Sequence, residues 1–210
     1  MTRRPHGFTL VELLIVIAIL AALIGLTTAA VTAVQRKSQV KACKATIDAI
    51  AGALASYESD FGDYPPTSLA ALGARTNRTN EGSEALVRCL TTKDRGGPYY
   101  DFKEQDLGNT DGDRLSGRGD RTSSALGSRE LYEVLDPWGN PLIYFHHRDY
   151  KRPRGLDRYQ TTGEEGLQTC RPRPSDKTGQ YPGYGRFVIW SCGPDGVNED
   201  GEGDDVCSWK

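Results

Sequence analysis

The stretch that decides the fold is Gly7-Phe8-Thr9-Leu10-Val11-Glu12-Leu13-Leu14-Ile15. It opens an apolar run over residues 8–34 that contains a single charge, on Glu12. About 20 apolar residues suffice to cross a bilayer, so residues 8–34 are predicted to form a transmembrane helix. Arg3 and Arg4 precede the run and favour a cytoplasmic N-terminus, although basic residues also follow it, so the charge signal for orientation is mixed.

Composition limits what the rest of the chain can be. The 210 residues carry a net charge of −2, with 26% charged and 37% hydrophobic residues, which fits one soluble domain behind the apolar run. The near-neutral charge gives no support to nucleic-acid binding. The sequence contains no nucleophile elbow, phosphate loop or zinc signature, so no enzymatic activity is expected.

The N-terminal helix is predicted to continue beyond the apolar run as far as Gly62, where Pro65 and Pro66 stop it. Apolar residues recur along this part at spacings of three and four, which places them on one helical face. They are Cys43, Ile47, Ile50, Leu54, Tyr57 and Phe61. This face is predicted to pack against a folded domain.

The remaining residues, 65–210, predict a small globular domain. Residues 69–72 and 83–90 resemble short helical pieces, and residues 142–146 and 187–191 are strand candidates bounded by Gly- and Pro-rich turns. The polar, glycine-rich stretches 91–128 and 148–183 are predicted to be long loops. The expected fold class is α+β, with a long N-terminal helix packed on a small antiparallel β-sheet.

Glu12 requires an explanation, because an ionised carboxylate within an apolar helix costs about 3 kcal/mol or more near the bilayer centre. If the chain is cut between Gly7 and Phe8, Phe8 gains an ammonium group. The ammonium group of a neighbouring subunit could then pair with Glu12 in surroundings of low dielectric constant and set the register of a filament. The alternative is a conventional signal peptide cut near residues 29–33, which are small.

The segment from Gly193 to Trp209 contains six acids and neither Lys nor Arg. Calcium prefers six to eight oxygen ligands in flexible geometry, so this acidic, glycine-rich segment predicts a calcium loop, with a solvated acidic tail as the alternative. A second acidic turn, residues 109–113, lacks the EF-hand spacing and is expected to be a solvated loop. The expected ligands in the first segment are Asp195, Asp200, Asp204 and Asp205.

Five cysteines are present, and no Cys-x-x-Cys pair occurs among them. Cys192 and Cys207 enclose the acidic segment, and in an oxidising compartment they are predicted to form a disulfide. Closing a loop of about 15 residues would contribute about 3 kcal/mol in the chain-entropy picture. The alternative is that the cysteines are small buried apolar residues.

Residues 7–12 resemble the class III signal of type IV pilins and type II secretion pseudopilins. The resemblance implies that a prepilin peptidase cuts after Gly7 and methylates Phe8, and that Glu12 aids assembly. Residues 56–65 resemble the end of the long helix in the major pseudopilin, and residues 136–144 resemble its first hairpin. Residues 191–196, with 205–209, resemble its calcium loop.

These resemblances imply a structural subunit of a type II secretion pseudopilus, a filament that drives protein export. The implied parts are a cleaved leader (1–7), a transmembrane and assembly helix (8–34), the periplasmic half of the helix (35–64) and a globular domain (65–210). The protein would be single-pass in the inner membrane, with its C-terminal domain in the periplasm.

The implied partners are further copies of the chain in a homopolymer, minor pseudopilins, the prepilin peptidase and the inner-membrane secretion platform. Two alternatives remain. One is a type IV pilin of a surface filament used for adhesion, motility or DNA uptake. The other is a conventionally secreted binding domain.

Overall fold

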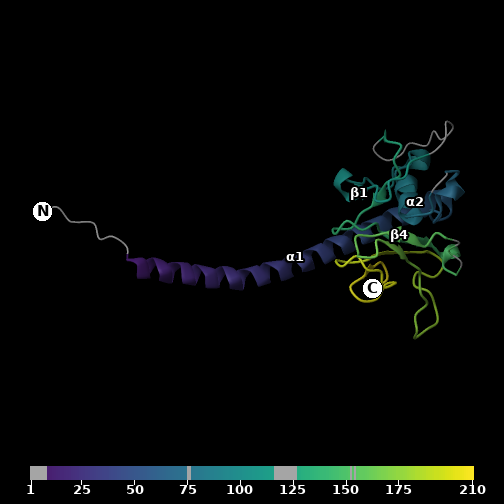
Figure 1. Cartoon of the computed structure of the whole chain (residues 1–210). Helices are drawn as coiled ribbons and strands as arrows, with labels where there is room; N and C mark the ends of the chain where they lie inside the picture. Colours follow the sequence, from purple (N-terminus) through teal and green to yellow (C-terminus); the bar gives the residue numbers. More distant parts are fainter. Residues whose placement is uncertain (1–8, 75–76, 116–126, 152, 154) are drawn as a thin grey trace. The chain divides into compact units, whose positions relative to one another are not determined.

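The computed structural model describes residues 9–74, 77–115, 127–151, 153 and 155–210, without the side chains of residues 26–30. The chain divides into two compact units, Met1–Gln39 and Val40–Lys210. One helix, α1 (Leu10–Phe61), belongs in part to each of them (Figure 1).

In the first unit, α1 exposes its apolar side chains. Among the side chains that the structure describes between Leu10 and Val34, thirteen large apolar ones are exposed, including those of Ile17 and Leu20. Within the described residues, no helix combines the length and the apolar character needed to cross a membrane. The transmembrane helix predicted for residues 8–34 is therefore not confirmed.

The second unit confirms both the end of α1 and its apolar face. The helix ends at Phe61, and Gly62 follows with a φ of +79°, the left-handed conformation in which glycine commonly terminates helices. Cys43, Ile47, Ile50, Leu54 and Tyr57 are all buried, and Phe61 stacks on Tyr57 with ring centroids 4.3 Å apart.

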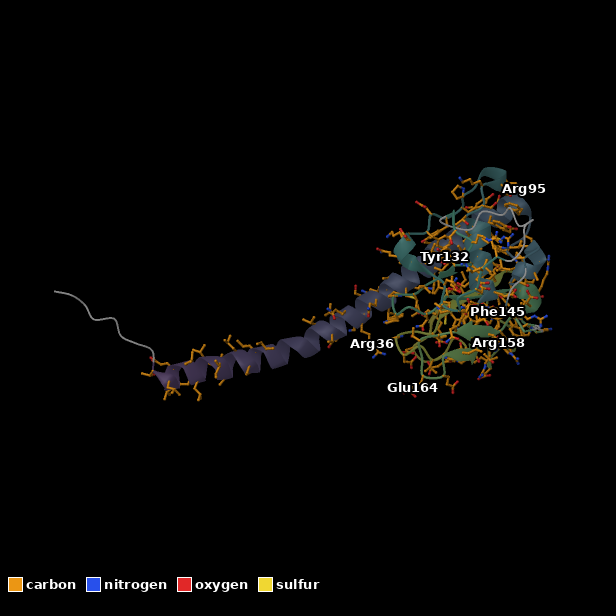
Figure 2. The ribbon with its side chains drawn as sticks, turned by 45° about the horizontal axis from the view of Figure 1, so that its top comes forward. Arg36, Arg95, Tyr132, Phe145, Arg158 and Glu164 are labelled. Carbon is orange, nitrogen blue, oxygen red and sulfur yellow. The ribbon has the colours of Figure 1, made fainter. Side chains whose placement is uncertain are left out.

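The main sheet confirms the two predicted strands, which pair antiparallel. Its order is β3 (Ile143–His146), β6 (Phe187–Ser191) and β7 (Val206–Cys207), with Ile143 opposite Trp190. These strands carry buried side chains throughout, and Phe145 lies inside the globular unit (Figure 2).

Helix α2 (Glu81–Leu90) follows the short helix η1 (Leu69–Leu72) and packs against β3 and β2 (Glu133–Val134). Gly82 permits this approach, because a side chain there would collide with the carbonyl oxygen of Tyr144. The two short helices predicted from the sequence are thus confirmed.

The two long loops predicted at 91–128 and 148–183 are wrong in part. The first contains β1 (Leu107–Gly108), which pairs with β2, and the second contains the hairpin of β4 (Arg158–Gln160) and β5 (Leu167–Thr169). Strands of two or three residues are too short for alternation to be visible in the sequence. Single-turn helices also occur here, namely η2 (Asp94–Gly96), η3 (Glu104–Asp106) and η5 (His147–Asp149).

In the part of the chain that the structure describes, the second unit thus combines three small antiparallel sheets with α2 and the C-terminal half of α1, and the α+β class is confirmed.

Candidate functional site

At the start of α1, Thr9 and Glu12 hydrogen-bond each other reciprocally. The backbone N–H and the hydroxyl of Thr9 donate to Glu12 Oε2 over 2.9 and 2.8 Å, and the N–H of Glu12 donates to Thr9 Oγ1 over 3.2 Å. This arrangement is a capping box, which satisfies N–H groups that a helix start leaves open. Thr-x-x-Glu before an apolar run is the sequence signature of a capping box, so residues 9–12 could have predicted this arrangement.

Glu12 therefore has a partner within its own chain. The predicted cleavage pair, Gly7 and Phe8, lies outside the described residues. The proposed pairing of Glu12 with an ammonium group at Phe8 thus stays a prediction.

The C-terminal acidic loop starts where β6 ends, at Ser191, and the buried side chain of Asp136 accepts a hydrogen bond from that residue. Ser191 Oγ donates to Asp136 Oδ2 over 2.5 Å, and the N–H of Asn140 donates to Asp136 Oδ1 over 2.9 Å. Asn140 Nδ2 in turn donates to the carbonyl oxygen of Gly193 over 3.2 Å. The turn around Asp136 thereby fixes the backbone that leads into the acidic loop.

Within this loop, Asp205 is the buried acid. Its Oδ2 accepts hydrogen bonds from the N–H groups of Glu199 (3.1 Å) and Gly201 (2.7 Å), whereas its Oδ1 is buried without a hydrogen-bond partner among the described residues. Burial raises the pKa of Asp205 to about 7, and the neighbouring Glu199 and Asp204 carboxylates add to this effect. The N–H of Asp204 donates to Glu199 Oε2 over 2.9 Å. Glu199, Asp204 and Asp205 thus lie together.

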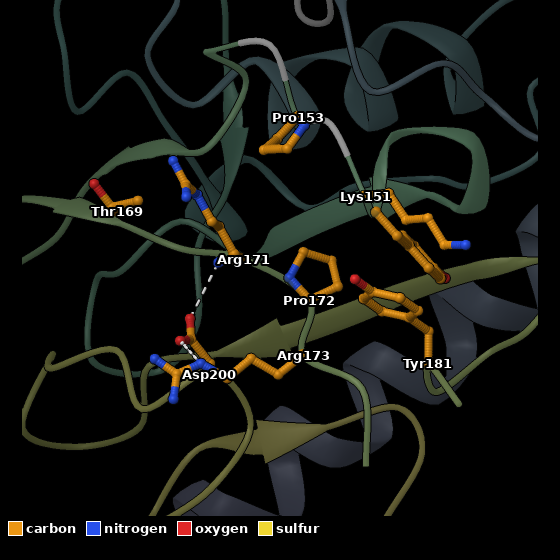
Figure 3. A pocket seen from close by; sticks show the side chains of 9 residues that line it. Lys151, Pro153, Thr169, Arg171, Pro172, Arg173, Tyr181 and Asp200 are labelled. Atoms are coloured by element: carbon orange, nitrogen blue, oxygen red, sulfur yellow. Dashed lines mark hydrogen bonds and ion pairs between the residues drawn. The ribbon is translucent and has the colours of Figure 1, made fainter. Parts of the chain in front are cut away.

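Asp200, another of the four expected calcium ligands, instead contacts two arginine residues. Arg173 Nε lies 2.6 Å from Asp200 Oδ2, and the N–H of Arg171 donates to Asp200 Oδ1 over 3.0 Å (Figure 3). These arginines line a pocket of about 520 Å³ beside the loop. The guanidinium group of Arg173, which is distant in sequence, therefore offsets part of the loop's charge, and the local composition of the loop could not reveal this.

Asp195 is exposed and accepts a hydrogen bond from the N–H of Val197 over 2.9 Å. Across the described residues, the four expected ligands do not bring three side-chain ligand atoms within 4.8 Å of one another. Backbone carbonyls would have to complete any cation site in this loop.

Comparison with known proteins gives matches to the N-terminal segment and to most of the chain. Residues 2–28 match the model of the prokaryotic N-terminal methylation motif. The chain is 30% identical to the type II secretion system core protein G of Pseudomonas aeruginosa over 164 residues, which cover 78% of this chain and 89% of that protein. The chain belongs to the type II secretion core protein G family. No solved structure matches it.

In this core protein G family member, all five cysteines are buried and free. Cys207 lies opposite Trp190 in the β6–β7 pair, and its thiol donates to the carbonyl oxygen of Gly201 over 3.5 Å. Cys192 instead lies beside Cys170, whose pKa is raised well above its usual range by burial and by the Cys192 thiol. The predicted disulfide between Cys192 and Cys207 stays a prediction, and in this structure the Cys192 thiol has Cys170 as its neighbour.

Proposed function

We propose that this chain is a structural subunit of the type II secretion pseudopilus. Family membership carries the proposal, because the match covers most of this chain and most of the Pseudomonas aeruginosa protein. The role is the assembly of a filament from copies of the chain, with minor pseudopilins and an inner-membrane platform as partners.

In this proposal a prepilin peptidase cuts between Gly7 and Phe8 and methylates Phe8. The matched methylation motif and the basic leader support this step. Residues 8–34 then anchor the chain in the inner membrane, with the globular unit in the periplasm. The exposed apolar side chains of α1 support the anchor, since such a surface requires lipid or apolar partners.

Deletion of the gene tests this function. Loss of exported proteins from the medium, with surface pili unchanged, is the expected result. Loss of surface pili or motility with export intact would instead establish the type IV pilin alternative.

Glu12 has two candidate roles that one pair of variants separates. Glu12→Ala removes both the capping box and the charge, whereas Glu12→Gln keeps a side chain suited to the capping box but loses the charge. If pairing with a neighbour's ammonium group drives assembly, both variants are processed but fail to form filaments. Filaments formed by Glu12→Gln and not by Glu12→Ala would assign Glu12 to capping alone.

The C-terminal loop is proposed to bind calcium through Asp204 and Asp205, with Asp195 and backbone carbonyls near Ser191 and Cys192. The buried Asp205 Oδ1, which lacks a hydrogen-bond donor among the described residues, supports this proposal. A bound calcium ion would neutralise the carboxylates that face one another in the loop.

Thermal melting of the full chain in detergent, with calcium or with chelator, tests the loop site. Calcium should raise the melting temperature by mass action, and Asp205→Asn should remove most of that increase. The matched control is Asp176→Asn, which changes an exposed acid in another loop. An unchanged shift in Asp205→Asn would contradict the proposal.

A further inference from the structure

A second group of acids lies where α2, β2 and the turn at residues 109–113 meet. One carboxylate oxygen each from Glu84, Asp111 and Glu133 lies within 4.8 Å of the others. The turn was expected to be a solvated loop, but Asp111 and Asp113 are both half-buried. The turn is partly buried because tertiary packing places it against residues 77–84 and Glu133, which are distant from it in the sequence.

Amide donors fix the orientation of two of these carboxylates. Asn80 Nδ2 donates to Glu133 Oε1 over 3.1 Å, and the N–H of Thr110 donates to Glu133 Oε2 over 2.8 Å. Asn77 Nδ2 donates to Asp111 Oδ2 over 3.0 Å. Such outer partners hold metal-ligating carboxylates in place in known metal sites.

Glu84 is the exceptional member of the group. Its side chain lies on α2, the residue is 1% exposed, and no N–H or hydroxyl group among the described residues donates to either carboxylate oxygen, whose neighbour is the carboxyl group of Asp113. Burying a carboxylate without partners is costly, so Glu84 needs either a proton or a cation. Burial, followed by the charges of Asp113, Asp111 and Glu133, raises the pKa of Glu84 to about 11.

We propose that Glu84, Asp111 and Glu133 bind a calcium ion at a site separate from the C-terminal loop. All the side-chain ligand atoms are carboxylate oxygens, which hard divalent cations prefer. Calcium fits better than magnesium, because it accepts irregular geometry and sheds water more readily. Asp111 is half-exposed and provides the side from which an ion can enter.

The ion would join three segments that are far apart in sequence. Glu84 belongs to α2, Glu133 belongs to β2, and Asp111 belongs to the turn that follows β1. Asp113 lies next to Glu84, since each affects the pKa of the other, and it is a further carboxylate at the edge of the site. Calcium would therefore fix the β1–β2 ribbon to α2.

The test is equilibrium dialysis of calcium against the full chain in detergent. Glu84→Gln should bind one ion fewer per chain than wild type, and so should Asp111→Asn, whose half-exposed position limits any effect on folding. The matched control, Glu164→Gln, alters an exposed acid and should bind as many ions as wild type (Figure 2).

Wild-type stoichiometry in both Glu84→Gln and Asp111→Asn would overturn the proposal and leave Glu84 as a protonated buried acid. The comparison is independent of the C-terminal loop, since loss of that site appears only in Asp205→Asn.

Discussion

Leu54 lies at the centre of the face on which α1 packs, so truncating it tests how the second unit is held together. Leu54 is fully buried, in a cluster that includes Ile50 of α1, Leu86 of α2 and Ile189 of β6. Leu54→Ala would leave a cavity within this cluster.

The expected cost follows from the buried atoms. Removing three carbon groups loses about 2.4 kcal/mol of transfer free energy, at about 0.8 kcal/mol each. The cavity that remains raises the total to about 3–4 kcal/mol. For a unit of this size, a loss of about 3 kcal/mol lowers the melting temperature by about 6–12 °C.

Tryptophan fluorescence during urea unfolding of the full chain in detergent measures this change. Trp190 is fully buried and lies edge-on to Trp209, with ring centroids 5.9 Å apart, so unfolding alters its emission. Leu167→Ala is the matched control, because it makes the same chemical change at a residue that is 38% exposed.

The control should lose about 1 kcal/mol or less. Equal losses in Leu54→Ala and Leu167→Ala would refute the conclusion that this face of α1 forms part of the core.

Three further predictions concern the leader, a close backbone contact and pH. Gly7→Val should leave the precursor uncut, and an intact mass that begins at Phe8 would contradict this expectation. Gly82→Ala should cost about 2 kcal/mol or more by forcing α2 away from β3, as urea unfolding would show. Burial lowers the pKa of His146 despite its 3.0 Å contact with Asp63, so the folded state resists protonation. Stability should therefore fall as pH drops below about 6.5, the usual histidine pKa, and His146→Gln should flatten this dependence in melts across that range.

Much of the fold could be predicted because its signals are local. The spacing of apolar residues along α1 and the glycine at its end depend only on neighbouring residues, and the structure confirms both. Strands β3 and β6 were also predictable, since each is a continuous apolar segment between turns. The β4–β5 hairpin was not, because its strands are short and only Tyr159 among them is fully buried.

The candidate sites divide in the same way. Sequence alone indicated the leader, the lone acid at Glu12 and the acidic C-terminal loop, because each is a contiguous pattern whose chemistry is unusual where it stands. Only the tertiary structure showed which side chains the buried acids, the arginines and the cysteines contact. Arg173 reaches Asp200, Cys170 meets Cys192, and Glu84 faces Asp111 because strand register and helix packing bring distant segments together. Such contacts depend on pairing across the whole domain, and no local spacing encodes them.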